Sequence, residues 1–106
     1  MTETEYLRDV ARVLDEVQDA VDRAQIDADC SLSGMVLTIE LDDGAKVVLN
    51  AQAPTRQLWL AARSGAMHFV QDGGLWVDLR TGEEFFAALT RVVSGLLGRP
   101  VTLRAA

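Results

Sequence analysis

The sequence predicts an α+β fold, a two-layer α-β sandwich in which two helices pack on one face of an antiparallel sheet. Three observations predict it. Apolar residues recur at three- and four-residue spacing near both ends of the chain, which is typical of amphipathic helices. Between these segments, short stretches alternate apolar and polar residues, and glycine-containing turns separate the stretches. We therefore expect a helix, five or six strands and a second helix, within a single domain of residues 1–106.

The first helix is predicted from Thr2 to about Ala24. Thr2 and Glu5 form a capping-box pattern, in which each side chain accepts a hydrogen bond from the other residue's backbone N–H. The apolar positions then fall on one stripe: Tyr6, Val10, Val13, Leu14, Val17 and Val21. Carboxylates fall on the opposite arc, diluted by three arginines: Glu5, Asp9, Asp15, Glu16, Asp19 and Asp22.

The first strand is predicted from Asp27, where the period of the pattern changes to two. Ala28, Cys30 and Leu32 alternate with polar residues, which indicates a half-buried strand. We therefore expect Cys30 to point into the core, as a small hydrophobic side chain.

Turn signals separate the remaining strands, at Gly34, Asp42-Asp43-Gly44, Ser64-Gly65 and Asp72-Gly73-Gly74. Alternation predicts the inward positions of these strands, which are Met35, Leu37, Ile39, Leu41, Val47, Leu49, Leu58, Leu60, Met67 and Phe69. A short last strand is expected from Leu75 to Leu79, and alternation leaves the face of Trp76 open. The uncovered face of the sheet is expected to meet water.

The second helix is predicted to begin at a capping box formed by Thr81 and Glu84, and to end at Gly98 and Pro100. Its apolar positions are Phe85, Phe86, Leu89, Val92, Val93 and Leu96. An extended tail from Val101 to Arg104 follows it.

The net charge of −6 is concentrated near the N-terminus, because residues 3–29 contain nine acids and three arginines. Such a charge repels phosphate backbones and anionic lipid, so nucleic acids and membranes are poor partners, whereas cations and basic proteins are good ones. Asp15, Asp19 and Asp22 are spaced closely enough to share one hard cation, which solvated carboxylates would bind weakly. The alternative is a solvated helix face without a specific ligand.

Sequence signatures of enzymes are absent. The chain has no phosphate-binding glycine loop, no dinucleotide-binding motif and no nucleophile elbow, and His68 is its only imidazole. Cys30 is the only cysteine, so neither an internal disulfide nor a four-ligand zinc site is expected. The acidic N-terminus resembles neither an export signal nor an organelle presequence, so we expect a cytoplasmic protein.

Trp59 is predicted to point outward, because its neighbours Leu58 and Leu60 take the inward positions. A large aromatic residue on an open sheet face, beside the polar Gln57, is typical of an interface anchor.

The stretch from Asn50 to Leu60 resembles the frataxin signature, Asn-x-Gln-x-Pro-x-x-Gln-(Ile/Val/Leu)-Trp-Leu, at seven specified positions of eleven. Gly65-Ala66-Met67-His68-Phe69 is similar to the Gly-Gly-Tyr-His-Phe of the bacterial branch of that family. Other matches to this branch are Asp29-Cys30, Trp76-Val77, Arg80-Thr81-Gly82-Glu83 and Val101-Thr102-Leu103-Arg104. The resemblance covers essentially the whole chain.

This resemblance implies a monomer that binds ferrous or ferric iron, and other divalent cations, weakly through an acidic ridge. It also implies docking on the cysteine desulfurase and the scaffold protein of iron-sulfur cluster assembly, as a regulator or iron donor. The ridge maps to Glu5, Asp9, Asp15, Glu16, Asp19, Asp22, Asp27 and Asp29. The partner contacts map to Asp15, Glu16, Asp19, Asp22, Asn50, Gln57 and Trp59.

The chain departs from the family pattern at positions near the ridge, which are Leu7, Gln18, Ala20, Arg23 and Ser31. These departures thin the ridge and argue against tight or multi-ion iron binding more than against docking. The first hypothesis is therefore a non-catalytic adaptor. The alternatives are an iron storage or ferroxidase protein and an acidic interaction module that never uses metal.

Overall fold

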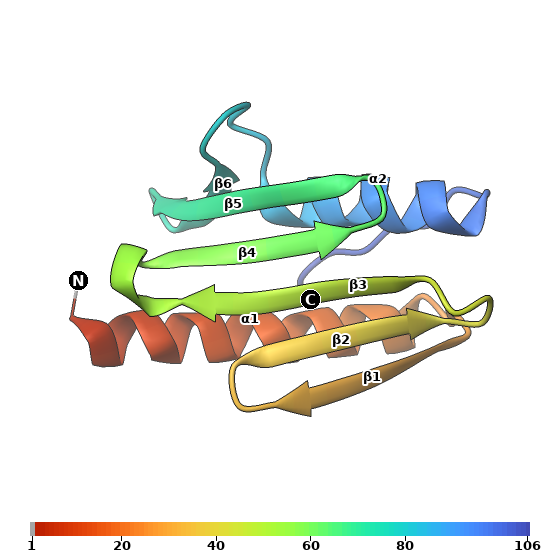
Figure 1. Cartoon of the computed structure of the whole chain (residues 1–106), viewed down its shortest axis with the longest axis horizontal. Coiled ribbons are helices and arrows are strands. Elements are labelled where there is room, and N and C mark those ends of the chain that lie inside the picture. The colour runs from red at the N-terminus through yellow and green to blue at the C-terminus, as the bar shows by residue number, and fades with distance from the viewer. Residues whose placement is uncertain (1) are drawn as a thin grey trace.

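The computed structural model describes residues 2–106 and shows two helices and a six-stranded sheet. The elements are α1 (Glu3–Arg23), β1 (Ala28–Ser33), β2 (Val36–Leu41), β3 (Lys46–Gln52), the 3-10 turn η1 (Ala53–Thr55), β4 (Gln57–Ala62), β5 (Gly65–Asp72), β6 (Leu75–Asp78) and α2 (Phe85–Leu97). The strands are antiparallel and follow one another in sequence order across the sheet. Both helices lie behind the same face of the sheet, as Figure 1 shows. The α+β sandwich predicted from the sequence is confirmed.

The core lies between the helices and the inner sheet face. Every apolar position predicted for the stripe of α1 is buried, and so are Leu37, Leu49, Leu58 and Leu60 of the strands. Trp76, whose face the alternation left open, points inward and is 6% exposed. We call the opposite, helix-free side of the sheet the outer sheet face.

Two of the three predicted helix caps are present. Thr2 and Glu5 form the capping box of α1, and Gly98 ends α2 in a left-handed conformation with φ of 71°. The prediction that Thr81 caps α2 is wrong. Glu84 is the N-cap and accepts from the backbone of Phe86 and Ala87, because the Thr81 hydroxyl instead donates to the Asp78 carboxylate.

The prediction that Cys30 is buried is also wrong. Cys30 lies opposite Ile39 in the register of β1 and β2 and therefore faces the helix side, yet it is exposed, as Leu32 is. The reason is that β1 is the edge strand, and all its residues after Ala28 are exposed. Alternation gave the correct direction of these side chains but not their burial.

The C-terminal tail closes the helix layer. Leu103 is 2% exposed, and its N–H and carbonyl both bond to the Thr90 hydroxyl of α2. Arg23 of α1 donates to the Arg104 carbonyl at 2.6 Å, which ties the end of the first helix to the tail. No helix within residues 2–106 is both long and apolar enough to cross a membrane.

Candidate functional site: an acidic ridge and an aromatic sheet surface

The ridge acids at the N-terminal half of α1 are engaged with other groups. The Glu5 carboxylate accepts from the Thr2 backbone N–H at 3.1 Å, and the hydrogen bonds with Thr2 lower the pKa of Glu5 below its usual value. Asp9 is half-buried, accepts from the Gln71 amide of β5 at 3.1 Å and lies 3.7 Å from the Arg8 guanidinium. Glu5 and Asp9 are therefore less free to bind a cation or a partner than their spacing indicated.

Asp15, Asp19 and Asp22 all point into solvent from the C-terminal half of α1. Their spacing of four and then three residues places them on one side of the helix, turned away from the sheet. Glu16 is half-buried and instead lines a hollow between α1, β6 and α2, beside Arg12 and Trp76. Glu5 is exposed too but is bonded to Thr2, so the acids of the helical ridge that are both exposed and without a partner among residues 2–106 form a row of three aspartates.

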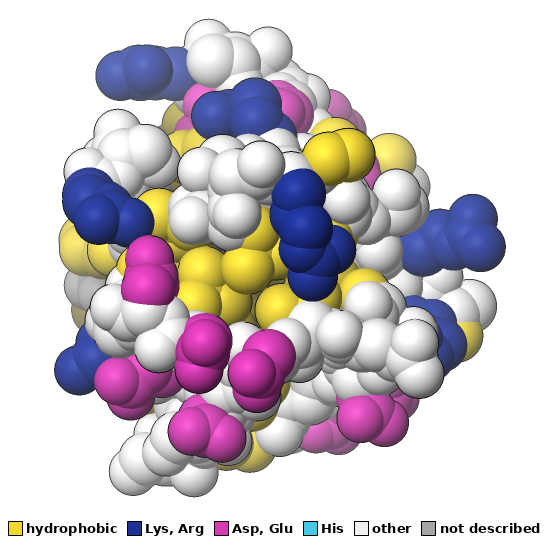
Figure 2. Space-filling model, turned by 90° about the vertical axis from the view of Figure 1, so that its right-hand side faces the viewer, with side chains coloured by type: hydrophobic (Ala, Val, Ile, Leu, Met, Phe, Trp, Pro, Cys, Tyr) yellow, Lys and Arg dark blue, Asp and Glu magenta, His cyan; other side chains and the backbone are white. Residues whose placement is uncertain are grey.

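Asp27 and Asp29 meet two further acids that were not predicted, Glu40 and Asp42. These four carboxylate residues line one shallow depression of about 190 Å³, and Asp29 stands directly opposite Glu40 in the register of β1 and β2. The register could have been read from the sequence, because a two-residue turn at Gly34 sets this pairing. In Figure 2, which looks onto this end of the molecule, carboxylates gather in the lower half, where α1 ends and β1 begins.

The carboxylates of the ridge do not converge. Within residues 2–106, no group of three or more His, Cys, Asp or Glu side chains is arranged to hold a metal ion. The ridge offers rows of solvated oxygen donors, which suit hard cations but do not form a cage around one.

The second predicted surface lies on the outer sheet face. The η1 turn, with Pro54 near its start, reverses the chain between β3 and β4 and sets Asn50 directly opposite Trp59. The indole N–H of Trp59 donates to the Gln57 side chain at 2.6 Å. The three partner residues predicted on this face are therefore brought together.

His68 of β5 completes this surface and was not predicted as part of it. It lies opposite Trp59 in the register of β4 and β5, and the two rings stack with centroids 4.3 Å apart and planes 15° apart. Stacking on His68 leaves the indole half-buried and holds it in one orientation. We call Asn50, Gln57, Trp59 and His68 the Trp59 surface.

The row of exposed aspartates and the Trp59 surface lie in opposite layers of the sandwich. Both helices cover one face of the sheet, and the outer arc of α1 faces away from it, whereas Trp59 stands on the outer sheet face. One flat partner surface cannot contact both at once. Among the acids of the depression, Asp29 and Glu40 stand on the outer side of β1 and β2, the same side as Trp59.

The chain is similar to proteins of one family over nearly its whole length. The family model of a frataxin-like domain matches residues 1–99. The iron-sulfur cluster assembly protein CyaY of Janthinobacterium sp. (strain Marseille) is 43% identical, over 98% of this chain and 97% of that protein. The protein of the same name from Ralstonia nicotianae is 44% identical, over 97% of this chain and 95% of its own length.

Solved structures agree with these sequence relatives. The frataxin of Psychromonas ingrahamii superposes with a TM-score of 0.90 at 25% identity, and the match covers 96% of this chain and 97% of that one. A trimeric frataxin of the yeast Saccharomyces cerevisiae, solved in a ferrous complex, superposes with a TM-score of 0.72 at 30% identity, over 86% of this chain and 87% of its own.

Proposed function

The chain belongs to the frataxin-like family, and we propose that it is a non-catalytic accessory protein of iron-sulfur cluster assembly in the bacterial cytoplasm. Its curated relatives carry the name iron-sulfur cluster assembly protein CyaY. The observation that carries the proposal is the Trp59 surface, where a stacked and hydrogen-bonded indole stands on an otherwise open sheet face. An ordered aromatic side chain flanked by polar groups is typical of the centre of a protein interface.

We propose that the two surfaces serve two proteins of the assembly complex. The exposed aspartates of α1 would meet a basic patch on the cysteine desulfurase, because opposite charges steer association and fix orientation. The Trp59 surface would pack against the neighbouring scaffold protein. The opposite placement of the two surfaces supports this arrangement, in which the protein bridges its partners.

Iron would bind as a weakly held, exchangeable cargo or regulatory ion. Asp27 and Asp29 with Glu40 and Asp42 supply the densest group of oxygen donors, and the yeast relative was solved in a ferrous complex. Because these donors are solvated and do not converge, we expect dissociation constants of roughly 10⁻⁵ to 10⁻³ M. This donor set suits holding iron loosely better than oxidising it at a paired-ion centre.

Charge reversal tests the docking part of the proposal. We expect Asp19→Lys and Asp22→Lys each to slow association with the desulfurase at low salt, and the difference from the wild type to shrink as salt is added. Asp72→Lys is the matched control, because Asp72 is exposed at the β5–β6 turn, outside the ridge, and gives the same change in net charge. Unchanged association rates for both ridge variants would refute electrostatic docking through α1.

A ferrous titration tests the metal part. We expect gradual NMR line broadening at residues 27–29 and 40–42, without saturation at a low stoichiometric ratio. Tight stoichiometric binding with accelerated oxidation of iron would instead favour a storage or ferroxidase protein. No broadening at any acid would favour a metal-independent interaction module. Desulfurase activity measured with and without ferrous iron then gives the direction of regulation.

A further inference from the structure

Strand β5 extends beyond its neighbour β6 and leaves part of its edge without a partner strand. β5 has eight residues and β6 has four. β6 pairs only with Phe69 to Asp72, whereas β4 pairs with the other edge of β5 from Gly65 to Phe69. Residues 65–68 are therefore hydrogen-bonded to a strand on one side only.

The open edge presents backbone hydrogen-bonding groups. The His68 carbonyl accepts from the Leu79 N–H at 2.9 Å, which is the last contact before the chain leaves this edge. The N–H and C=O of one strand residue point to the same edge of the strand, and every second residue repeats this direction. Ala66 stands two residues before His68, so its N–H and C=O point to the same open edge. Within residues 2–106, no backbone group bonds to Ala66 on this side, and Ala66 is exposed.

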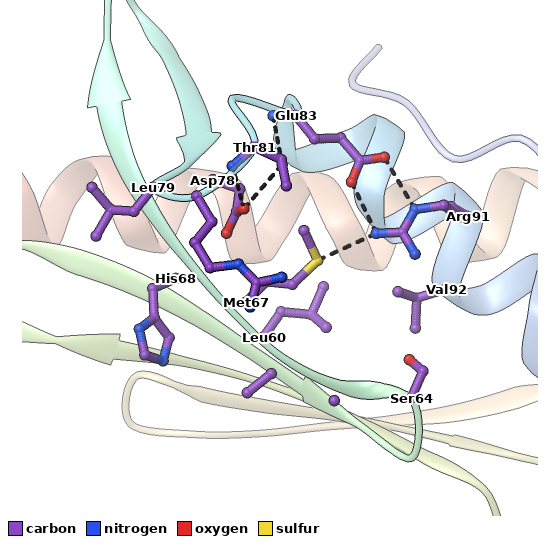
Figure 3. A pocket seen from close by; sticks show the side chains of 13 residues that line it. Leu60, Ser64, Met67, His68, Asp78, Leu79, Thr81, Glu83, Arg91 and Val92 are labelled. Carbon is purple, nitrogen blue, oxygen red and sulfur yellow. Dashed lines mark hydrogen bonds and ion pairs between the residues drawn. The ribbon is translucent and has the colours of Figure 1, made fainter.

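A groove runs along this open edge. It begins as a pocket of about 330 Å³ between β5, the β6–α2 connection and α2. Figure 3 shows Leu60, Met67 and Val92 converging on its floor from β4, β5 and α2. A second hollow of about 540 Å³, lined by Gly95 and Leu96, shares Val92 with the first. We call the two together the edge groove.

The rim of the edge groove carries more available positive charge than negative. Arg63, Arg80 and Arg91 line it. Arg91 is paired with Glu83, with nitrogen–oxygen distances of 2.9 and 3.2 Å. Arg63 and Arg80 have no carboxylate within ion-pair distance among residues 2–106. The one other acid, Asp78, is buried, with its carboxylate held by Thr81.

We propose that the edge groove binds an extended acidic peptide segment of a partner protein, which lies alongside β5 and pairs with the free backbone N–H and C=O of Ala66. Three features carry the proposal: an unpaired strand edge, an apolar floor that can take one side chain, and free arginines on the rim. Main-chain hydrogen bonds supply affinity in this mode of recognition, and side-chain pockets supply specificity. Charge complementarity selects an acidic segment, although the whole molecule, at −6, repels one. The groove lies apart from the aspartates of α1, so this contact is distinct from the docking proposed for them, although it shares His68 with the Trp59 surface.

The probe is the peptide acetyl-Glu-Asp-Leu-Asp-Glu-amide, added to ¹⁵N-labelled protein and followed by NMR. We expect saturable shifts centred on the amides of Ala66, His68 and Arg80. The double variant Arg63→Glu/Arg80→Glu should weaken binding by about tenfold, from the loss of two exposed charge contacts. Lys46→Glu/Arg99→Glu is the matched control, since both residues are exposed, lie outside the groove and give the same net charge. We expect it to bind within about twofold of the wild type.

Changes in the peptide separate the three contributions. Met67 directs its own backbone groups toward β4, and those of His68 are already bonded to Leu79 and Asp78. The peptide therefore bonds to Ala66 through an Asp next to the Leu that faces Met67, and the direction of the added strand decides which Asp this is. N-methylation of both Asp residues should therefore abolish binding, and replacing Leu by Gly should weaken it severalfold.

Binding that survives N-methylation would overturn strand addition. The proposal would be overturned if the peptide caused no saturable shifts, or if the analogue with lysine at each acidic position bound with equal affinity. It would also be overturned if the two double variants lost peptide affinity equally. Concentration-dependent broadening of these amides without peptide would identify a second copy of the chain as the occupant.

Discussion

Replacing Trp59 by alanine removes the largest side chain of the Trp59 surface without touching the core. Leu58 and Leu60, its neighbours in β4, point to the other face of the sheet and are at most 1% exposed. The substitution deletes the stack on His68, with its 4.3 Å ring separation, and the 2.6 Å hydrogen bond to Gln57. The expected damage is therefore confined to the outer sheet face.

The two lost contacts set the size of the effect on stability. An aromatic stack contributes about 0.5–1.5 kcal/mol and a partly exposed hydrogen bond about 0.5–1.5 kcal/mol. We expect Trp59→Ala to lower the free energy of unfolding by about 1–3 kcal/mol, which a domain with a typical stability of roughly 5–15 kcal/mol tolerates. An aromatic anchor at the centre of an interface commonly contributes about 2 kcal/mol or more, so affinity for the desulfurase–scaffold complex should fall about 30-fold.

Calorimetric titration into the desulfurase–scaffold complex measures this loss, with urea unfolding as the check on folding. Trp59→Phe is the conservative control, because it keeps a ring against His68 and loses only the hydrogen bond to Gln57. We expect it to retain most of the affinity. If the alanine variant is folded and binds as tightly as the wild type, Trp59 is not an interface anchor.

Three further predictions follow from other parts of the fold. Burial raises the pKa of Asp78, but hydrogen bonds from Thr81 and nearby backbone amides outweigh it and hold the pKa below the usual 3.8. A carboxylate with a lowered folded-state pKa stabilises the fold above its unfolded pKa, and this contribution is lost as the pH falls through the folded value. Asp78→Asn should therefore lower the free energy of unfolding by about 1–3 kcal/mol at pH 7, and urea curves should show the difference shrinking below pH 3.8. Cys30 is exposed to solvent. Its thiol is partly shielded by neighbouring atoms and lies near the negative charge of Asp29, and both effects raise the pKa of the thiol above 9.0. A chromogenic disulfide reagent should therefore modify Cys30 in the folded protein, at a rate that rises with pH and is higher in the Asp29→Asn variant. Reaction only after unfolding would contradict the exposed position of Cys30. Leu103→Ala, at a 2% exposed site, should cost about 2–5 kcal/mol in urea unfolding, while Leu79→Ala, at a 57% exposed site, should cost little. Equal costs would show that the tail is not packed into the core.

The order of the elements could be predicted from the sequence because helix and strand periods differ sharply here. Leu58 and Leu60 bracket Trp59, so one register satisfies all three residues. Burial was harder to predict, since it depends on what covers a strand. Cys30 points the predicted way, but it stands on an edge strand that the helices do not reach. Thr81 matches a capping pattern, but its hydroxyl bonds instead to a carboxylate that becomes buried only in the folded chain.

The candidate site was predictable where residues lie on one element and not where they meet across elements. Asp15, Asp19 and Asp22 share a side of α1 through helix geometry alone. The interactions of Asp9 with Gln71, and of Trp59 with His68, depend on helix packing and strand register. Helical periodicity assigned Asp9 to the same arc as Asp19, although only Asp9 is held by the sheet.

The sequential order of the strands has a consequence for folding. Every strand pairs with its neighbour in the chain, so the sheet can form through successive hairpins, each closing a short loop at low entropic cost. The contacts of highest sequence separation belong to α1 and the tail, such as that between Arg23 and Arg104. We therefore expect the two termini to detach together as one cooperative unit before the hairpins separate, with β2 to β4 showing the slowest amide hydrogen exchange. Transient opening would then expose the inner sheet face, which makes the packing of the two chain ends the main protection of this protein against aggregation.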